Sequence, residues 1–399
     1  MKKSFFTYIL IIIIILPLFL FVFNKKENNN KKEIVFWTLQ LGTFNNYINN
    51  IITNFENENP EYTIKWIDVP YAEGEKRTLA AILTDNPPDL VNSTPDFSIL
   101  LAKKNALETI KKDDLKDFLE TITDTLKNEN KYFGIPFYAT SAITLYNKDL
   151  TTKKIKTYNE LFEFTPIQNT YTTMINLAEN DTLLKILNKY EINSAYTINN
   201  EKSILIFKKI KEMYDSEKMP KESITQTHRE SLEKYMAGQL SYLVTGANFL
   251  NIIKENAPNI YKKTEIISQL VGDTGKYDYS LMNFIIPQKA KNKDGALKFA
   301  LYFTNQENQI EFSKLTGTLP TNKNALKQSY FSNIENNNLE EKARIICAKQ
   351  LENIQQTKNS TKNKKELNTL SANYIQEILI KNSDIKTTLD KFAEDWKKL

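Results

Sequence analysis

The sequence predicts an α/β fold made of two domain-sized units. With 399 residues the chain is too long for one small core, and its hydrophobic content of 41% is that of a globular protein. Short apolar runs that are typical of strands alternate with longer segments of helical spacing. From about Lys291 onward the pattern is almost entirely helical. Together these observations indicate a mostly parallel sheet that is covered by helices on both faces.

Residues 1–32 are predicted to form an N-terminal signal or membrane anchor followed by a hydrophilic tether. A basic start precedes an apolar run from about Phe5 to Phe23, which is long enough to span a bilayer as a helix. No small-residue cleavage site and no cysteine follows this run directly. We therefore favour an uncleaved anchor over a cleaved signal. In both cases the rest of the chain is expected on the extracytoplasmic side of the membrane.

Strands and helices alternate in the segment after the tether. In order, it contains a strand "KEIVFWTLQ" (32–40), a helix (43–58), a strand "EYTIKWIDVP" (61–70), a helix "EGEKRTLAAILTD" (73–85) and a strand "PPDLVNS" (87–93). Thr43 is the expected cap of the first helix. Ligands of such sheets collect beyond the carboxyl ends of the strands, which makes "WTLQLG" and "NSTPDF" candidate ligand segments.

The same alternation continues through the middle of the chain. The predicted strands are "YTTMINLAEN" (171–180), "QLSYLVTGANF" (239–249), "TEIISQL" (264–270) and "YSLMNFIIP" (279–287). The segment "SILIFKKIKEMYDSEKMP" (203–220) is a predicted helix. Near the end, "LSANYIQEILI" (370–380) and "SDIKTTLDKFAEDWKKL" (383–399) carry apolar stripes that predict packed helices.

Composition excludes most catalytic chemistry. The chain has one cysteine and one histidine, so neither a zinc site nor a Ser-His-Asp triad is expected, and we predict no metal and no cofactor. Cys347 is expected to be a buried structural thiol, and His228 a surface residue near a helix start. The 9 glycines form no phosphate-binding loop. Lysine and glutamate are mixed throughout the body, so the net charge of +5 does not indicate nucleic-acid binding.

Several segments follow one another in an order that is found in a known family. They are "IVFW", "FENENPEYTIKW", "LAAILTDNPPDLV", "YFGIPFYATSAITLYNKDL", "TYNELFEF", "YMAGQLSYLVTGANF" and "NKDGALKFALYFTNQENQIEFSKLTGTLPT". In this order they resemble the extracellular solute-binding proteins of carbohydrate ABC importers, specifically family 1, which is similar to maltose-binding protein. The resemblance covers nearly the whole chain beyond the tether.

The resemblance implies a two-lobe periplasmic-binding-protein fold of type II, with three hinge crossings and a helical C-terminus. Lobe 1 would comprise residues 33–140 plus 278–316. Lobe 2 would comprise residues 141–277 plus 317–399.

The resemblance also implies a mechanism. The strand "FYATSAITLYN" would be the first crossing, with the others near Lys276–Tyr279 and Gly317–Pro320, and the lobes would close around a ligand. The implied function is that of a substrate-binding component of an ABC importer, in the periplasm or at the cell surface. Such a protein is not an enzyme; it would act as a monomer and deliver a sugar or small polar solute to membrane permease subunits.

Sugar recognition needs aromatic faces and planar amides or carboxylates. Candidates from lobe 1 and the crossing are Trp37, Gln40, Asn92, Asp96, Tyr138 and Thr140. Core packing is the alternative for Trp37, and helix capping is the alternative for Asp96.

In lobe 2, Glu179 stands where the family carries an acidic sugar ligand, and Asn248 stands where an indole is usual. The residues after Glu179 are Asn180, Asp181 and Thr182, where maltodextrin binders place aromatic rings. This departure favours a smaller or more polar ligand, such as a monosaccharide, a disaccharide or a glycerol-phosphate-like compound.

Two other functions remain open from the sequence. Asp96 and Glu179 could serve a glycoside hydrolase that uses two carboxylates. A membrane-anchored sensor that reports its ligand to a partner protein is the third reading. Arg77 and Arg229 would suit an anionic ligand, but solvated positions on helices are the expected reading for both.

Overall fold

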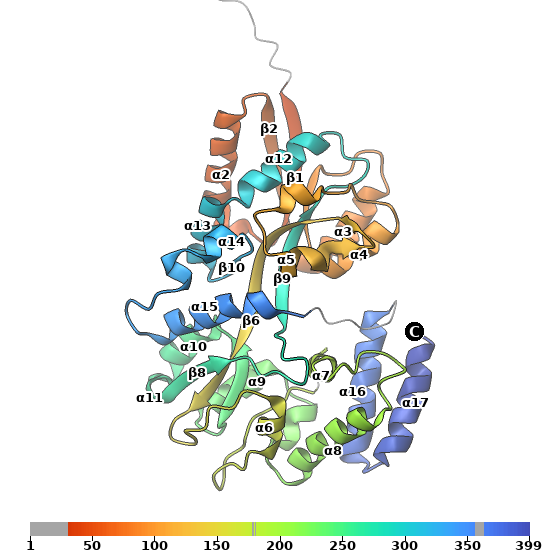
Figure 1. The fold of residues 1–399 in the computed structure, drawn as a ribbon, viewed down its shortest axis with the longest axis vertical. Helices are drawn as coiled ribbons and strands as arrows, with labels where there is room; N and C mark the ends of the chain where they lie inside the picture. Colours follow the sequence, from red (N-terminus) through yellow and green to blue (C-terminus); the bar gives the residue numbers. More distant parts are fainter. Residues whose placement is uncertain (1–30, 178, 180, 356–362) are drawn as a thin grey trace, which may run out of the picture.

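The computed structural model describes residues 31–399 apart from residues 178, 180 and 356–362 (Figure 1). The expected anchor therefore lies outside the described residues. Within the described part of the chain, no helix is both long and apolar enough to cross a bilayer. Figure 1 shows an elongated molecule in which β6 and β9 run between two groups of helices.

Three parallel strands open the fold. β1 (Lys32–Leu39) lies between β2 (Tyr62–Val69) and β3 (Leu90–Ser93) and pairs in parallel with both. α2 (Asn45–Glu58) and α3 (Gly74–Ile82) form the two connections. The predicted order of strand, helix, strand, helix and strand is confirmed.

The start of α2 differs from the prediction. Thr43 lies in a short 3₁₀ turn, and the N-cap of the helix is Phe44, whose side chain makes no capping hydrogen bond. The carboxylate of Asp68 instead accepts the backbone N–H groups of Leu41 at 2.9 Å and Gly42 at 2.8 Å. A side chain from the neighbouring strand therefore satisfies two amides at the start of the 3₁₀ turn that precedes the helix.

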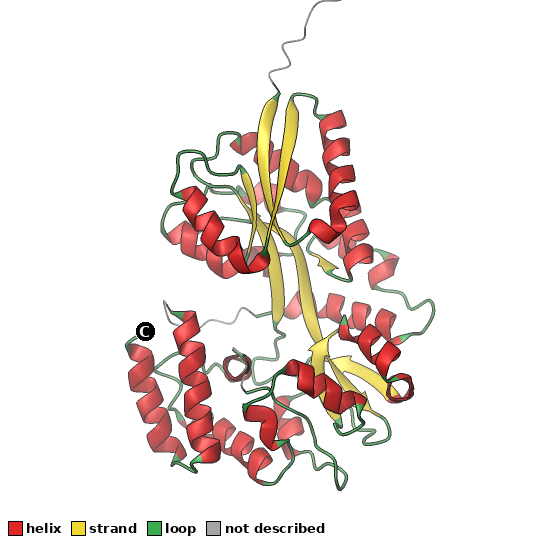
Figure 2. Cartoon of the chain, turned by 180° about the vertical axis from the view of Figure 1, so that it is seen from behind, coloured by secondary structure: helices red, strands yellow, loops and turns green. Residues whose placement is uncertain are grey.

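One long strand connects both ends of the sheet. β6 (Ile135–Asn147) pairs with β9 (Tyr279–Ile285) up to Ser141. Beyond that residue it pairs with β7 (Tyr242–Gly246) on one side and β8 (Thr264–Ser268) on the other. Figure 2 shows one long strand continuing from the upper sheet into the lower one.

The prediction of a mostly parallel sheet is wrong. Within the described strands of the main sheet, only the pairs β1–β2 and β1–β3 are parallel, and the pairs that involve β6 or β9 are antiparallel. The reason is topological, because a strand that carries the chain out of one region and a strand that brings it back must run in opposite directions. The pattern of strand and helix signals does not reveal which strands make these crossings.

The predicted helical C-terminus is confirmed. Further α-helices are α4 (Pro95–Lys103), α5 (Glu120–Thr123), α6 (Tyr158–Glu163), α7 (Thr182–Asn188), α8 (Glu201–Asp215), α9 (His228–Met236), α10 (Phe249–Asn256), α11 (Pro258–Lys263), α12 (Lys293–Phe303), α13 (Gln306–Thr316), α14 (Lys323–Leu326), α15 (Leu339–Gln350), α16 (Lys364–Ile380) and α17 (Ile385–Lys397). Short strands are β4 (Lys127–Asn128), β5 (Lys131–Tyr132) and β10 (Leu319–Pro320). We call β1–β3 with α2–α4, α12 and α13 the β1 part, and β7 and β8 with α6–α11 and α15–α17 the β8 part.

An aromatic core holds the β1 part together. Phe36 of β1 contacts Phe299 and Phe303 of α12, with ring centroids 5.2 Å and 5.7 Å apart. Phe55 of α2 lies 4.9 Å from Phe299, and Phe137 of β6 lies 5.2 Å from Phe303. Edge-on contacts of this kind add to the stabilisation from burial, so α12 is fixed across β1 and β6 although it is distant from both in sequence.

The β8 part has its own core, in which the last two helices form a hairpin. Tyr374 of α16 stacks on Phe392 of α17 with centroids 5.0 Å apart, and Phe392 stacks on Trp396 at 5.5 Å. Phe207 and Met213 of α8 belong to the same buried cluster. The core of the β1 part is a separate cluster.

The segment 171–180 is not the predicted strand. Among the described residues of this segment, only Tyr171 makes a strand-like bridge, to Leu240. The backbone N–H of Thr172 donates to the carbonyl of Lys218, and that of Leu177 donates to the carbonyl of Ser223. The apolar side chains are buried as the pattern requires, but among the described residues the backbone bonds to β7 at its start, where the Thr172 carbonyl accepts the N–H of Tyr242, and to loops further along.

Candidate functional site

A cavity of about 980 Å³ lies where β6 and β9 pass between the two parts. It is lined by β6, β9, the end of β7, residues 173–176 with Glu179, the starts of α7 and α9, the end of α13 and one side of α15. Pockets for small ligands usually have about 300–1,000 Å³ and occur between domains. The position and size of this cavity therefore suit a small solute.

Four of the predicted site residues line this cavity. Tyr138 and Thr140 lie on β6, Glu179 on the loop ahead of α7, and Asn248 directly after β7. The structure thus brings together residues from segments that lie far apart in the sequence. Their role as ligand contacts stays a prediction.

Glu179 is held by the start of α9. Its Oε1 accepts the backbone N–H of His228 at 2.7 Å, where the helix dipole favours a negative charge. The prediction that His228 is a surface residue is wrong, because its ring is half-buried, lies 4.8 Å from that of Phe249 and lines the cavity. Burial lowers the pKa of His228, so the ring is neutral at neutral pH. Its Nε2 has no partner within the described residues.

Two tyrosines that line the cavity carry neutral hydroxyl groups. Burial raises the pKa of Tyr138 to about 12 and that of Tyr279 to about 12. Both phenols therefore stay protonated at neutral pH and can donate a hydrogen bond. The ring of Tyr138 is fixed against Phe312 of α13, with centroids 5.5 Å apart.

Three other predicted residues lie in the β1 part, away from the large cavity. Asn92 lines a second cavity of about 210 Å³ between the starts of α3 and α4, and its Oδ1 has no partner in the described structure. Trp37 is half-buried and packs beside Val91 and Phe97. Gln40 is exposed at the end of β1, with a left-handed backbone (φ 54°).

Asp96 is exposed and also lies outside the large cavity. Its Oδ2 lies 2.7 Å from Nζ of Lys364, which joins the first turn of α4 to the first turn of α16. It is not the N-cap of α4, because that position is Thr94. The pair therefore connects the β1 part to the β8 part at the surface.

Sequence reasoning missed most of the cavity wall, including Tyr330, Lys314 and Arg344. Arg344 of α15 lies over the ring of Tyr330, with its Cζ 3.7 Å from the centroid, and donates from Nε to the Tyr330 carbonyl at 2.6 Å. Lys314 of α13 lies 5.6 Å from the same centroid. In the sequence both cations follow ordinary helical spacing, so no local signal distinguishes them from solvated side chains.

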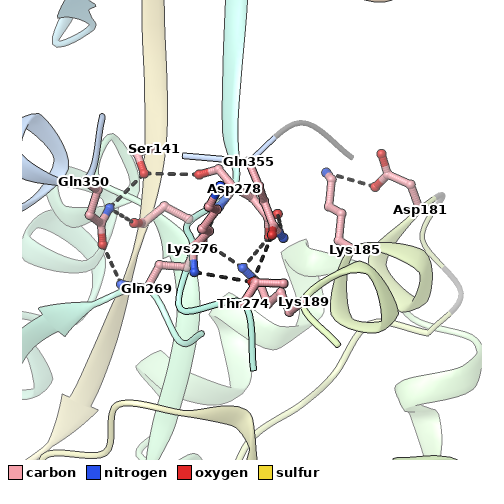
Figure 3. Close-up of polar contacts among 11 residues, drawn as sticks. Ser141, Asp181, Lys185, Lys189, Gln269, Thr274, Lys276, Asp278, Gln350 and Gln355 are labelled. Atoms are coloured by element: carbon pink, nitrogen blue, oxygen red, sulfur yellow. Dashed lines mark hydrogen bonds and ion pairs between the residues drawn. The ribbon is translucent and has the colours of Figure 1, made fainter. Parts of the chain in front are cut away.

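A buried ion pair lies beside the cavity, at the point where the chain enters β9 (Figure 3). Lys189 is 1% exposed, and its Nζ lies 2.7 Å from Oδ2 of Asp278 and 3.2 Å from Oε1 of Gln269. The same Gln269 oxygen accepts the backbone N–H of Asp278 at 2.7 Å. Burial lowers the pKa of Lys189, and Asp278 opposes this change.

The ion pair continues into a network that reaches β6. Gln350 Oε1 accepts the backbone N–H of Gln269 at 2.7 Å, and Gln350 Nε2 donates to Ser141 Oγ at 2.8 Å. Ser141 is the last residue of β6 that pairs with β9. In Figure 3 these side chains lie around the two crossing strands. The network therefore connects β6, the entry to β9 and the end of α15.

The cysteine has the predicted structural role. Cys347 is buried on α15, its thiol donates to the Ser141 carbonyl at 3.4 Å, and burial raises its pKa to about 12. A protonated thiol without a base is a poor nucleophile. In the part of the chain that the structure describes, no group of three or more histidine, cysteine or carboxylate side chains could hold a metal ion.

The chain has two α/β parts that share one long strand, and a polar cavity lies where that strand crosses between them. This arrangement defines a protein that binds a small solute. The family model "Bacterial extracellular solute-binding protein" matches residues 50–338, and the chain belongs to this family. The sequence-based resemblance and the type II fold are thereby confirmed.

Individual relatives agree with this assignment. A Brucella abortus (strain 2308) protein named as a binding protein is 24% identical over 316 residues, which cover 72% of this chain and 75% of the relative. Solved structures share the fold. Maltose-binding periplasmic protein MalE from Listeria monocytogenes, in complex with maltose, gives a TM-score of 0.71 at 20% identity and covers 92% of this chain and 98% of its own. The extracellular solute-binding protein from Staphylococcus aureus, also with maltose, gives 0.74 at 16% identity with the same coverage.

Proposed function

We propose that this protein is the extracytoplasmic substrate-binding component of an ABC importer. It takes a sugar or small polar solute into the large cavity and delivers it to a membrane permease. The observation that carries the proposal is the cavity itself, which lies at the strand crossing and presents neutral phenols together with Glu179 and Asn248. The neighbours from Listeria and Staphylococcus are described with bound maltose, which supports a carbohydrate ligand.

The proposed lobes follow the division expected from the sequence. Lobe 1 comprises residues 33–140 plus 278–316, and lobe 2 comprises residues 141–277 plus 317–399. On closure the second cavity, with Asn92, would approach the large one and complete the site from the side of lobe 1.

One boundary of this division can be refined. The backbone N–H of Thr321 donates to Oε1 of Gln309, and the N–H of Lys323 donates to the carbonyl of Asp117. These partners belong to lobe 1. We therefore place the third crossing after Lys323, before α15, and not at Gly317–Pro320.

The protein is proposed to work at the outer face of the cell membrane. Its family is extracellular, and residues 1–32 would serve as the anchor or export signal. The expected partners are permease subunits, with the binding protein acting as a monomer.

The arrangement of Asp96 and Glu179 does not support the glycoside hydrolase alternative. It required Asp96 to face Glu179, but Asp96 pairs with Lys364 outside the cavity that Glu179 lines. The members of this family are binding proteins.

Ligand-dependent unfolding of the full-length chain in mild detergent tests the proposal. Maltose, other disaccharides, hexoses and polyols are added separately, and the thermal midpoint is recorded. A ligand at about a hundred times its dissociation constant stabilises the folded state by roughly 2.7 kcal/mol. We expect one sugar class to raise the midpoint without being hydrolysed.

A variant of Glu179 tests whether the shift in the thermal midpoint comes from binding in the large cavity. Glu179→Gln should weaken binding, because a charged acceptor is lost, whereas Glu255→Gln, an exposed position on α10 outside the cavity, should not. Turnover of a sugar by the wild type would favour the hydrolase. A folded protein that no sugar or polyol stabilises would overturn the carbohydrate assignment.

A further inference from the structure

The carboxylates that line the large cavity are already engaged by the protein. Among the described residues they are Glu179, Asp278 and Glu340. Asp278 pairs with buried Lys189 at 2.7 Å, and Glu340 lies 3.6 Å from Lys254. Glu179 accepts the first N–H of α9 at 2.7 Å. Asp278 and Glu340 are thus neutralised by cations, and Glu179 is stabilised by a helix terminus.

The cations of the cavity are not balanced in the same way. Lys185 pairs with Asp181 at 2.9 Å. Lys314 and Arg344 also line the cavity, and neither forms an ion pair with any residue that the structure describes. Their common contact is the ring of Tyr330, and the Arg344 Nη nitrogens have no hydrogen-bond partner in the described part of the chain. Lys314 is exposed to solvent, and Arg344 interacts electrostatically with Glu341 of the same helix without a direct ion pair, so both cations on this wall remain available to a ligand.

A third group next to this wall also lacks a partner. Ser313 is 1% exposed and lines the cavity, and its Oγ has no hydrogen-bond partner in the described chain. A buried hydroxyl without a partner is costly, so such groups usually meet a ligand or water. The helix dipole favours a cation such as Lys314 in the last turn of α13. It does not account for a cation in the middle of α15, where Arg344 lies, or for the unpartnered hydroxyl group of Ser313.

We propose that the solute is an acidic sugar, whose phosphate or carboxylate group is bound by Lys314 and Arg344. The planar guanidinium of Arg344 matches the oxygens of such a group, and Lys314 adds a second positive charge. Glu179 and Tyr138, which line the same cavity, then accept and donate hydrogen bonds to the sugar hydroxyls. This inference rests on the proposed function and specifies its substrate class.

A matched ligand series tests the inference on the full-length chain in detergent. Glucose, galactose and mannose are each compared with their 6-phosphate and with their uronic acid, by calorimetry at low and high salt. One acidic sugar should bind at least about tenfold more tightly than its neutral form, and salt should reduce this difference. Whether the phosphate or the uronate is preferred identifies the acidic group.

Variants assign the effect to the two cations. Lys314→Gln and Arg344→Gln should each weaken binding of the acidic sugar by roughly tenfold or more and thereby reduce the preference for the acidic over the neutral sugar. Arg344→Lys should restore part of the loss. Lys349→Gln removes the same charge from an exposed position of α15 outside the cavity and should have no effect. The unfolding midpoint without ligand shows that each variant is folded.

The possible outcomes separate this inference from the proposed function. Tight binding of a neutral sugar that both variants leave unchanged would overturn the acidic ligand and keep the importer. An equal loss in Lys349→Gln would show only a general charge effect and would also overturn it. If no sugar of either kind binds to the folded protein, the proposed function fails, and the inference fails with it.

Discussion

Replacing Asp278 tests how strongly the network beside the cavity stabilises the fold. Asp278→Asn removes the carboxylate that lies 2.7 Å from Lys189 Nζ, while the ammonium stays in a site where the lysine is 1% exposed. Removing one partner of a buried pair costs about 3–5 kcal/mol, because the other charge is left uncompensated. Gln269 keeps its hydrogen bond of 3.2 Å to the ammonium. We therefore expect a loss of about 3 kcal/mol in the free energy of unfolding, measured by urea titration at neutral pH.

The loss should decrease at alkaline pH. Burial lowers the folded-state pKa of Lys189 and Asp278 opposes this, so the pKa falls further in the variant. A lysine whose folded pKa lies below its unfolded value destabilises the folded state at low pH, and this penalty disappears as the pH rises from the folded to the unfolded pKa. The penalty is larger in the variant. The difference between the two proteins should therefore approach zero above the unfolded pKa of about 10.4.

An exposed ion pair nearby provides the control. Asp273 lies 2.9 Å from Lys202, with side chains that are 47% and 42% exposed. Asp273→Asn should cost less than about 1 kcal/mol, because water screens the pair. Equal losses for the two variants, or a loss in Asp278→Asn that stays constant up to strongly alkaline pH, would refute the reasoning.

Three further predictions concern the fold, and urea titration checks each of them. Phe299→Ala should cost about 3–5 kcal/mol because it empties the aromatic core, whereas Leu83→Ala, at an exposed position, should stay within about 0.5 kcal/mol; similar values would contradict the described core. Thr157→Ala removes one side of the capping box of α6 and should cost about 1 kcal/mol, and no loss would mean that this box does not stabilise the helix. Gly295→Ala should cost about 1–3 kcal/mol. Its Cβ would lie 2.6 Å from the ring of Tyr62, and a neutral result would mean that the ring moves freely.

Much of the fold could be predicted from the sequence because local periodicity reflects burial. The apolar spacing of the segment 43–58 places Ile48, Ile51, Ile52 and Phe55 on the buried face of α2. The pattern of 171–180 was misleading for the same reason, because it reports buried side chains but not the partners of the backbone. Strand direction also depends on which strands cross between the parts, and this is decided by the whole topology.

The candidate site was only partly predictable. Tyr138 and Thr140 were found because they lie on the strand that resembles the family's crossing. Lys314 and Arg344 are brought together by the ring of Tyr330, from two helices that are distant in sequence. Their local patterns are those of ordinary helix surfaces, so only the tertiary structure shows that both line the cavity.

The continuity of β6 also affects how the protein unfolds. Up to Ser141 this strand pairs with β9, which also pairs with β3 of the β1 part, and after it with β7 and β8 of the β8 part, so both ends of the same thirteen-residue strand depend on different parts for hydrogen-bond partners. Loss of either part would leave an unpaired strand edge on the other, which is a template for aggregation. We therefore expect the two parts to melt in one cooperative transition. A protease cut within β6 should release two fragments that aggregate, and not two stable domains.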